Sequence, residues 1–139
     1  MHEAPTEHAR VKDSLELELE RGNQAPAVAR AALRGLCHER GLSPSLRHTL
    51  ALLTSEVVSN AVLHSDGPAE APILLQASID SGRVRVAVSD AGEGFIEKPR
   101  DRDRCGGGYG LYLLQKAASS WGVESRGGTQ VWFELSGEI

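Results

Sequence analysis

The chain has 139 residues, of which 40% are hydrophobic and 24% are charged, and this balance is typical of a single globular domain that folds without a disulfide or metal centre. Fifteen basic and nineteen acidic residues give a formal charge of −4, which disfavours direct nucleic-acid binding. No apolar run approaches the roughly 18 residues of a membrane span, and the N-terminus lacks the apolar centre of a signal peptide, so we expect a cytoplasmic protein without a membrane partner.

The N-terminal residues 1–14 are polar and unpatterned, which predicts a mobile tail ahead of one domain over residues 15–139. In residues 15–20 leucine alternates with glutamate, the period of a half-buried strand. The two cysteines, Cys37 and Cys105, match no metal or redox spacing. We therefore expect both of them to be free thiols.

Two helices are predicted next. Residues 26–40 place apolar side chains at three- and four-residue spacing, with a proline in the first turn and Gly41 just past the end. Ser43 and Pro44 then form an N-cap followed by proline at the first helical position. The helical spacing after them continues to about His64.

The second half of the chain is rich in strand signals. Residues 73–79 and 83–89 form one predicted hairpin, and residues 123–125 and 129–135 form another. A helix is predicted between the hairpins, over residues 109–120. This order lacks the strict alternation of a doubly wound sheet. The expected fold is an α+β two-layer sandwich, with helices on one face of a mixed, mainly antiparallel sheet.

The first pattern that can carry chemistry lies on the second predicted helix. Glu56, Asn60 and His64 recur every four residues, so they share one stripe beside the apolar face. A carboxylate, an amide and an imidazole that line a groove can accept a proton and hold a hard cation. The same spacing is also that of an ordinary polar border on an amphipathic helix.

A second pattern follows the strand at residues 83–89. Asp90 continues the apolar face of this strand, and a carboxylate there suits a donor such as the amine of a purine. Gly92 and Gly94 would let a ligand approach the backbone. The alternative is that Asp90 starts a turn with these glycines.

Two glycine-rich patterns complete the set. The stretch at residues 106–111 opens a predicted helix, where backbone N–H groups and the helix dipole favour an anion such as a triphosphate. Thr129 follows two glycines in the last predicted hairpin, where a simple turn also accounts for them. P-loop, complete dinucleotide-binding, nucleophile-elbow and HExxH signatures are missing from the sequence.

Taken in this order, the four patterns resemble those of the GHKL, or Bergerat-fold, ATPases. The matching segments are Glu56-x-x-x-Asn60, Asp90-x-Gly92-x-Gly94, Gly106-Gly107-Gly108-Tyr109-Gly110-Leu111 and Gly128-Thr129. Within that superfamily, residues 50–64 and the lack of a dimerisation region with a phosphoacceptor histidine resemble the anti-sigma factor serine/threonine kinases. The resemblance covers about residues 15–135.

The resemblance implies a role for each matched residue. Glu56 would be the general base that activates a serine or threonine hydroxyl, and Asn60 would bind the Mg²⁺ that bridges the phosphates of ATP or ADP. Asp90 and Thr129 would hold the adenine, while His64 occupies a position common in the family. The residues that would shape the nucleotide pocket and its lid are Gly92, Gly94, Gly106, Gly107, Gly108, Gly110 and Leu111.

The implied function is that of an ATP-binding anti-sigma factor with kinase activity. Such a protein sequesters a sigma factor and phosphorylates an anti-anti-sigma protein of the STAS type, and it is compatible with a homodimer. Tyr109 and Tyr112 stand where many relatives carry arginine, and the lid over residues 95–105 is short. The alternative is therefore a nucleotide-gated regulatory binding module of the same fold without phosphotransfer. A histidine kinase fragment is disfavoured, since this length leaves no room for a dimerisation hairpin.

Overall fold

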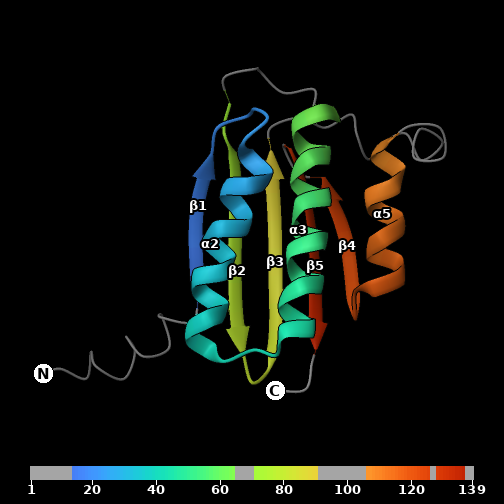
Figure 1. Cartoon of the computed structure of the whole chain (residues 1–139). Coiled ribbons are helices and arrows are strands. Elements are labelled where there is room, and N and C mark those ends of the chain that lie inside the picture. Colours follow the sequence, from blue (N-terminus) through green and yellow to red (C-terminus); the bar gives the residue numbers. More distant parts are fainter. Residues whose placement is uncertain (1–13, 65–70, 91–105, 126–127, 137–139) are drawn as a thin grey trace, which may run out of the picture.

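The computed structural model describes residues 14–64, 71–90, 106–125 and 128–136. Within this part of the chain, three helices cover one face of a five-stranded sheet (Figure 1). The strands are β1 (Ser14–Leu19), β2 (Ile73–Asp80), β3 (Arg83–Asp90), β4 (Ser120–Ser125) and β5 (Thr129–Ser136). The helices are α2 (Ala25–Arg40), α3 (Pro44–His64) and α5 (Gly106–Ala117).

The strands are arranged in the order β1-β2-β3-β5-β4, and every neighbouring pair is antiparallel. The predicted α+β sandwich with a mainly antiparallel sheet is confirmed, and the described strands include no parallel pair. Ser81 and Gly82 join β2 to β3 with positive φ angles of 56° and 78°, as a two-residue hairpin turn requires. The last strand, β5, lies between β3 and β4, so the end of β3 meets the start of β5.

Local signals set the junction between α2 and α3. Gly41 adopts a left-handed conformation with φ 70°, and its N–H donates to the carbonyl oxygens of Cys37 and His38 at the end of α2. The Oγ of Ser43 accepts a hydrogen bond of 3.2 Å from the backbone N–H of Leu46 in the first turn of α3. Both predicted helices and their capping residues are confirmed.

Three predicted boundaries in the C-terminal half are wrong. The helix α5 begins at Gly106 rather than at Tyr109. The prediction missed this start because the glycines carry no apolar periodicity from which it can be read. The helix also ends at Ala117, earlier than predicted. The strand β4 begins at Ser120 rather than at Val123. Its ladder with β5, where Ser120 lies opposite Glu134, extends a segment that has weak strand propensity of its own.

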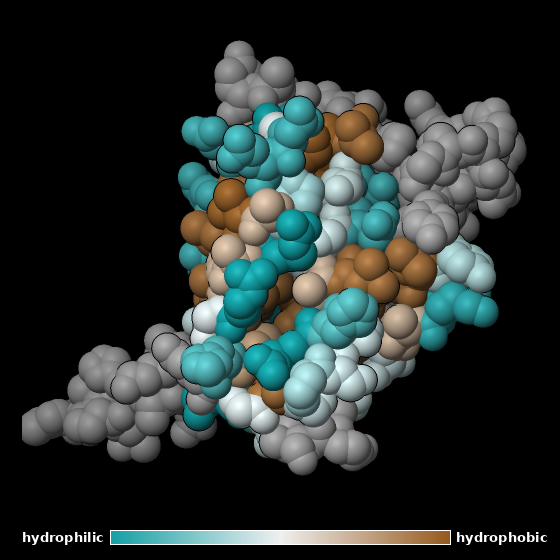
Figure 2. All heavy atoms as spheres, viewed as in Figure 1, coloured by the Kyte–Doolittle hydropathy of each residue, from teal (hydrophilic) through white to brown (hydrophobic). Residues whose placement is uncertain are grey.

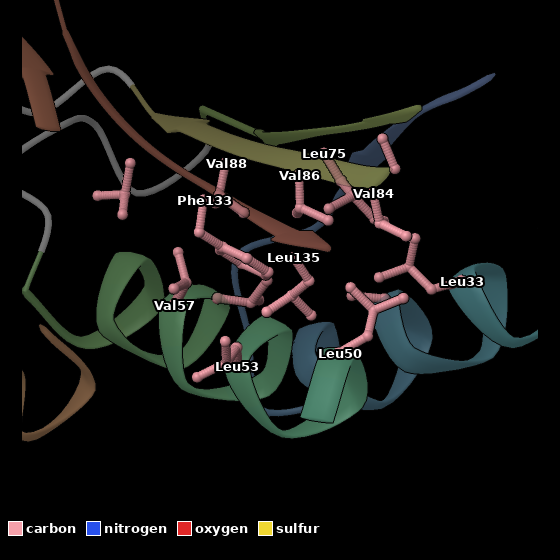
Figure 3. Packing of buried hydrophobic residues seen from close by; sticks show 14 of the residues in the cluster. Leu33, Leu50, Leu53, Val57, Leu75, Val84, Val86, Val88, Phe133 and Leu135 are labelled. Carbon is pink, nitrogen blue, oxygen red and sulfur yellow. The ribbon is translucent and has the colours of Figure 1, made fainter. Parts of the chain in front are cut away.

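The core fills the space between the helices and the sheet (Figure 3). Leu50, Leu53 and Val57 of α3 point toward the sheet, where Val86 and Phe133 face them. None of these five side chains is more than 3% exposed, and burial of such side chains stabilises the fold by about 1.5–3 kcal/mol each. The packing holds α3 over β3 and β5, the two strands whose ends carry predicted site residues.

No described helix covers the opposite face of the sheet, which carries a polar network. Arg85 Nη1 donates to Glu134 Oε2 at 3.1 Å, and the same guanidinium lies 4.3 Å from the ring centroid of Trp132. The Oγ of Ser120 donates to Glu134 Oε1 at 3.3 Å. These contacts link β3, β5 and β4 side by side on the open face.

The solvent side of the helices mixes hydrophilic residues with scattered apolar ones (Figure 2). Among the described residues, the large hydrophobic side chains exposed there are those of Val28, Leu52, Leu63 and Tyr112. Among the described helices, none is long and apolar enough to span a membrane.

Candidate functional site

Four segments that carry predicted site residues lie at one end of the molecule, at the top of Figure 1. They are the C-terminal end of α3, the end of β3, the start of β5 and the start of α5. The helix α3 packs against β3, β5 and α5. The fold therefore brings residues that are far apart in the sequence to one end of the sheet.

The predicted stripe on α3 is present, and its members differ in burial. Two residues four positions apart on a helix point in directions that differ by about 40°. On α3 this difference turns the side chain of Asn60 closer to the core than that of Glu56. Glu56 is therefore half-buried, whereas Asn60 is only 6% exposed. His64 is the last residue of α3, and its side chain lies outside the described part. The result is an amide at the core boundary with a carboxylate nearer the solvent.

Asp90 and Thr129 are opposite each other in the last pair of the β3–β5 ladder. The buried side chains of Val84, Val86 and Val88 mark the helix-covered face of β3, and the alternation of the strand puts Asp90 on that face, as predicted. Thr129 is 3% exposed and Asp90 is half-buried. A carboxylate and a hydroxyl at the edge of the core can together accept a donor such as the adenine amine.

The predicted glycine segments are described only in part. Gly92 and Gly94 lie outside the described residues. The other glycine-rich segment, at residues 106–111, lies in α5, and its predicted site residues there are Gly106, Gly107, Gly108, Gly110 and Leu111. The first N–H groups of a helix have no intrahelical acceptor, and its dipole favours an anion. The residues from Gly106 to Leu111 thus form the first turns of a helix, and anion binding there stays a prediction.

The start of α5 carries no positive side chain. Its first two turns contain Tyr109 and Tyr112 but no basic residue, and Tyr112 is 51% exposed. Lys116 lies in the last turn, with its Nζ 5.5 Å from the ring centroid of Tyr112. Within α5, a phosphate at the helix start would therefore meet backbone N–H groups rather than a basic side chain.

The described residues include no group of three or more His, Cys, Asp and Glu side chains that could hold a metal ion. In nucleotide sites, Mg²⁺ retains water and binds phosphate oxygens together with one or two protein oxygens. The buried amide of Asn60 can supply one such oxygen. A single amide oxygen from the protein fits a magnesium ion that is held mainly by the nucleotide.

One contact near the paired acid and hydroxyl was not predicted. Gln130 Nε2 donates a hydrogen bond of 3.0 Å to Ser89 Oγ, and the two residues are opposite each other on the open face, one pair before Asp90 and Thr129. Alternation in the last strand indicates that Gln130 faces away from the core. Its partner lies 41 residues away, so no spacing rule could have found it.

Residues 19–135 match the family model described as the histidine kinase-like ATPase domain. Among solved structures, the chain is similar to the RsbU and RsbW domains of Rv1364c from Mycobacterium tuberculosis, with 24% identity and a TM-score of 0.71, over 88% of this chain and 32% of that chain. A blue-light activated histidine kinase from Erythrobacter litoralis is similar at 28% identity with a TM-score of 0.53, over 68% of this chain and 31% of that chain.

The histidine kinase domain of that Erythrobacter protein is similar at 30% identity with a TM-score of 0.50, over 63% of this chain and 45% of that chain. The present chain thus spans about a third of the first two structures and less than half of the third. No curated protein matches the chain. The similarity to the mycobacterial domains confirms the fold, and the family model covers most of the chain. As the order of its motifs predicted, the chain belongs to the histidine kinase-like ATPase, or GHKL, domain family.

Proposed function

We propose that this chain is an ATP-binding anti-sigma factor with serine/threonine protein kinase activity, which sequesters a sigma factor and phosphorylates an anti-anti-sigma protein of the STAS type. One observation carries the proposal: Glu56 and Asn60 share one side of α3, whose C-terminal end lies where Asp90 and Thr129 are paired. The family supports nucleotide binding, and the fold shared with an RsbW domain supports the regulatory role.

In this proposal the nucleotide lies between α3, α5 and the end of the sheet. Asp90 accepts a hydrogen bond from the adenine amine, supported by the hydroxyl of Thr129. The phosphates lie toward the first turn of α5, and Gly92 and Gly94 shape the pocket. The amide oxygen of Asn60 would help to hold Mg²⁺, which would neutralise charge on the phosphates when bound.

Glu56 is the residue that acts on the acceptor protein in this proposal. It is half-buried, so an acceptor hydroxyl can reach its carboxylate from the solvent side. The hydroxyl oxygen forms a bond to the γ-phosphorus, the bond from that phosphorus to ADP breaks, and the hydroxyl proton passes to Glu56. Without this base, transfer is expected to slow by about 100-fold or more.

A second function is favoured by the tyrosines at the start of α5. Transfer of a phosphoryl group needs positive charge on the phosphates, and the first two turns of α5 contain Tyr109 and Tyr112 but no basic residue. In this alternative, ATP or ADP occupancy sets the affinity for a partner without phosphotransfer. Both functions place the chain in the cytoplasm with a sigma factor and its antagonist, and both are compatible with a homodimer.

The decisive experiment measures transfer of labelled phosphate from γ-labelled ATP to STAS-type proteins from the same genome. We expect one of them to be labelled on serine or threonine, and Glu56→Gln to slow labelling by about 100-fold or more while ATP binding is retained. Glu124→Gln is the matched control, because Glu124 is exposed on β4. Unchanged transfer by Glu56→Gln would contradict the assigned mechanism. Nucleotide binding without any labelled acceptor would favour the binding module.

A further inference from the structure

Among the described strands, the pairing of β3 with its two neighbours ends at different residues. The β2–β3 ladder ends where Leu74 lies opposite Ser89, whereas the β3–β5 ladder continues for one more pair, to Asp90 and Thr129. Thr129 is paired on both sides, because β4 also reaches it through Ser125. The pairing with β5 therefore helps to position the backbone of Asp90 at the end of β3.

A side-chain hydrogen bond makes this attachment at the preceding pair. Gln130 Nε2 donates to Ser89 Oγ at 3.0 Å, and both side chains are half-buried on the open face. On the other side of β5, Gln130 is paired with Glu124 in the β4–β5 ladder. The bond thus ties the end of β3 to a strand that has neighbours on both sides. Because side chains alternate along a strand, this hydrogen bond lies on the open face of the sheet, whereas Asp90 lies on the helix-covered face.

We infer that Ser89 and Gln130 are positioning residues, which hold the carboxylate of Asp90 where the adenine amine can donate to it. This inference rests on the proposed nucleotide site. Neither side chain touches the nucleotide, since both point to the opposite face of the sheet. Loss of the Ser89–Gln130 bond should affect recognition of the adenine in particular. A looser end of β3 displaces the carboxylate that accepts from the adenine amine, while the nucleotide-binding groups on α3 and α5 stay in position.

The same two strands offer a matched control. Glu134 lies four residues after Gln130 on the same face of β5, and it accepts a hydrogen bond from the residue opposite it in β3, Arg85. This second bond joins the same strands far from Asp90. A general loss of sheet stability would follow from either truncation, whereas a loss of positioning would follow only from truncation of Gln130.

The experiment measures the dissociation constants of Mg·ATP and Mg·ITP for the full chain by calorimetry. ITP carries a carbonyl oxygen in place of the adenine amine and a proton on N1, so it lacks the amine donor assigned to Asp90 while it keeps the ribose and the triphosphate. We expect Ser89→Ala and Gln130→Ala to weaken ATP binding by threefold or more and to lower the preference for ATP over ITP. Ser89→Thr, which keeps the hydroxyl, and Glu134→Ala should both retain the wild-type preference.

Several results would overturn the inference. If Asp90→Asn lost ATP binding while Ser89→Ala and Gln130→Ala retained the wild-type ATP-to-ITP ratio, the pair would have no positioning role although the nucleotide site was real. An equal loss of that ratio in Glu134→Ala would show a general effect of sheet stability. Absence of ATP binding by the wild-type chain would overturn the proposed function itself, and the inference with it.

Discussion

Asp90 and Thr129 lie directly opposite each other in the last pair of the β3–β5 ladder, although a helix and a strand separate them in the sequence. Their side chains share the face that the helices cover, and Thr129 is almost fully buried. A carboxylate held beside a buried hydroxyl at the edge of a core is suited to one directed contact with a donor. This pairing supports the proposal that the adenine binds at the end of the sheet.

Replacement of Asp90 by asparagine is expected to weaken nucleotide binding by tenfold or more, because an amide no longer offers a charged acceptor to the adenine amine. A ligand that binds only the folded state raises its stability, by about 2.7 kcal/mol at 100 times the dissociation constant. Thermal unfolding with Mg·ATP and Mg·ADP should show a shift in the wild type that Asp90→Asn loses. Asp80→Asn, exposed at the β2–β3 turn, should keep the shift. A wild type that does not respond at millimolar nucleotide would contradict the prediction.

Replacement of Thr54 by valine is expected to stabilise the fold. The hydroxyl of Thr54 is fully buried in α3 and has no hydrogen-bond partner among the described residues. Removal of an unsatisfied buried hydroxyl should raise the free energy of unfolding by about 1 kcal/mol, which corresponds to about 3–5 °C in the midpoint of thermal unfolding. The same change at half-buried Thr49 of α3 should have little effect. Loss of stability in Thr54→Val would show that the hydroxyl has a partner after all.

The open face of the sheet has a position where only glycine fits. A Cβ at Gly122 would lie 2.8 Å from Nε1 of Trp132 and 2.9 Å from two further atoms of that indole. Gly122→Ala should therefore displace the indole from Arg85 and cost about 1–3 kcal/mol of stability in chemical denaturation. Gly35→Ala is the control, since Gly35 lies in α2 with no described atom within 4 Å of the new methyl group, and it should stabilise by about 0.5–1 kcal/mol. Equal effects of the two changes would contradict the packing of Trp132.

Burial raises the pKa of the Cys37 thiol above its ordinary value of 9.0, and the positive charge of Arg47 only partly offsets this effect. Above about pH 9 the unfolded chain releases this proton while the folded chain retains it, so the folded state binds more protons and stability falls as pH rises. We expect the free energy of unfolding to fall between about pH 8 and pH 10, and Cys37→Ala to lack this component. Both proteins should carry Cys105→Ser, and parallel curves for the two would contradict the prediction.

Much of the fold follows from short-range patterns in the sequence. Leucine and glutamate alternate in β1, and Ser43 and Gly41 mark a helix start and a helix end, because capping and face alternation depend on neighbours within a few residues. Four-residue spacing likewise determined that Glu56 and Asn60 share one side of α3. These features survive in the structure with boundaries that differ by a residue at most.

Tertiary structure alone decided the features that depend on distant segments. The start of β4 at Ser120 depends on pairing with β5, and the glycines of α5 gave no periodic signal for the start of that helix. The unequal burial of Glu56 and Asn60 depends on where the sheet and α5 contact α3. The insertion of β5 between β3 and β4, which brings its first residue opposite the last residue of β3, is likewise invisible in any local window. Strand order is set by the core that the whole chain buries together, and no short segment contains that information.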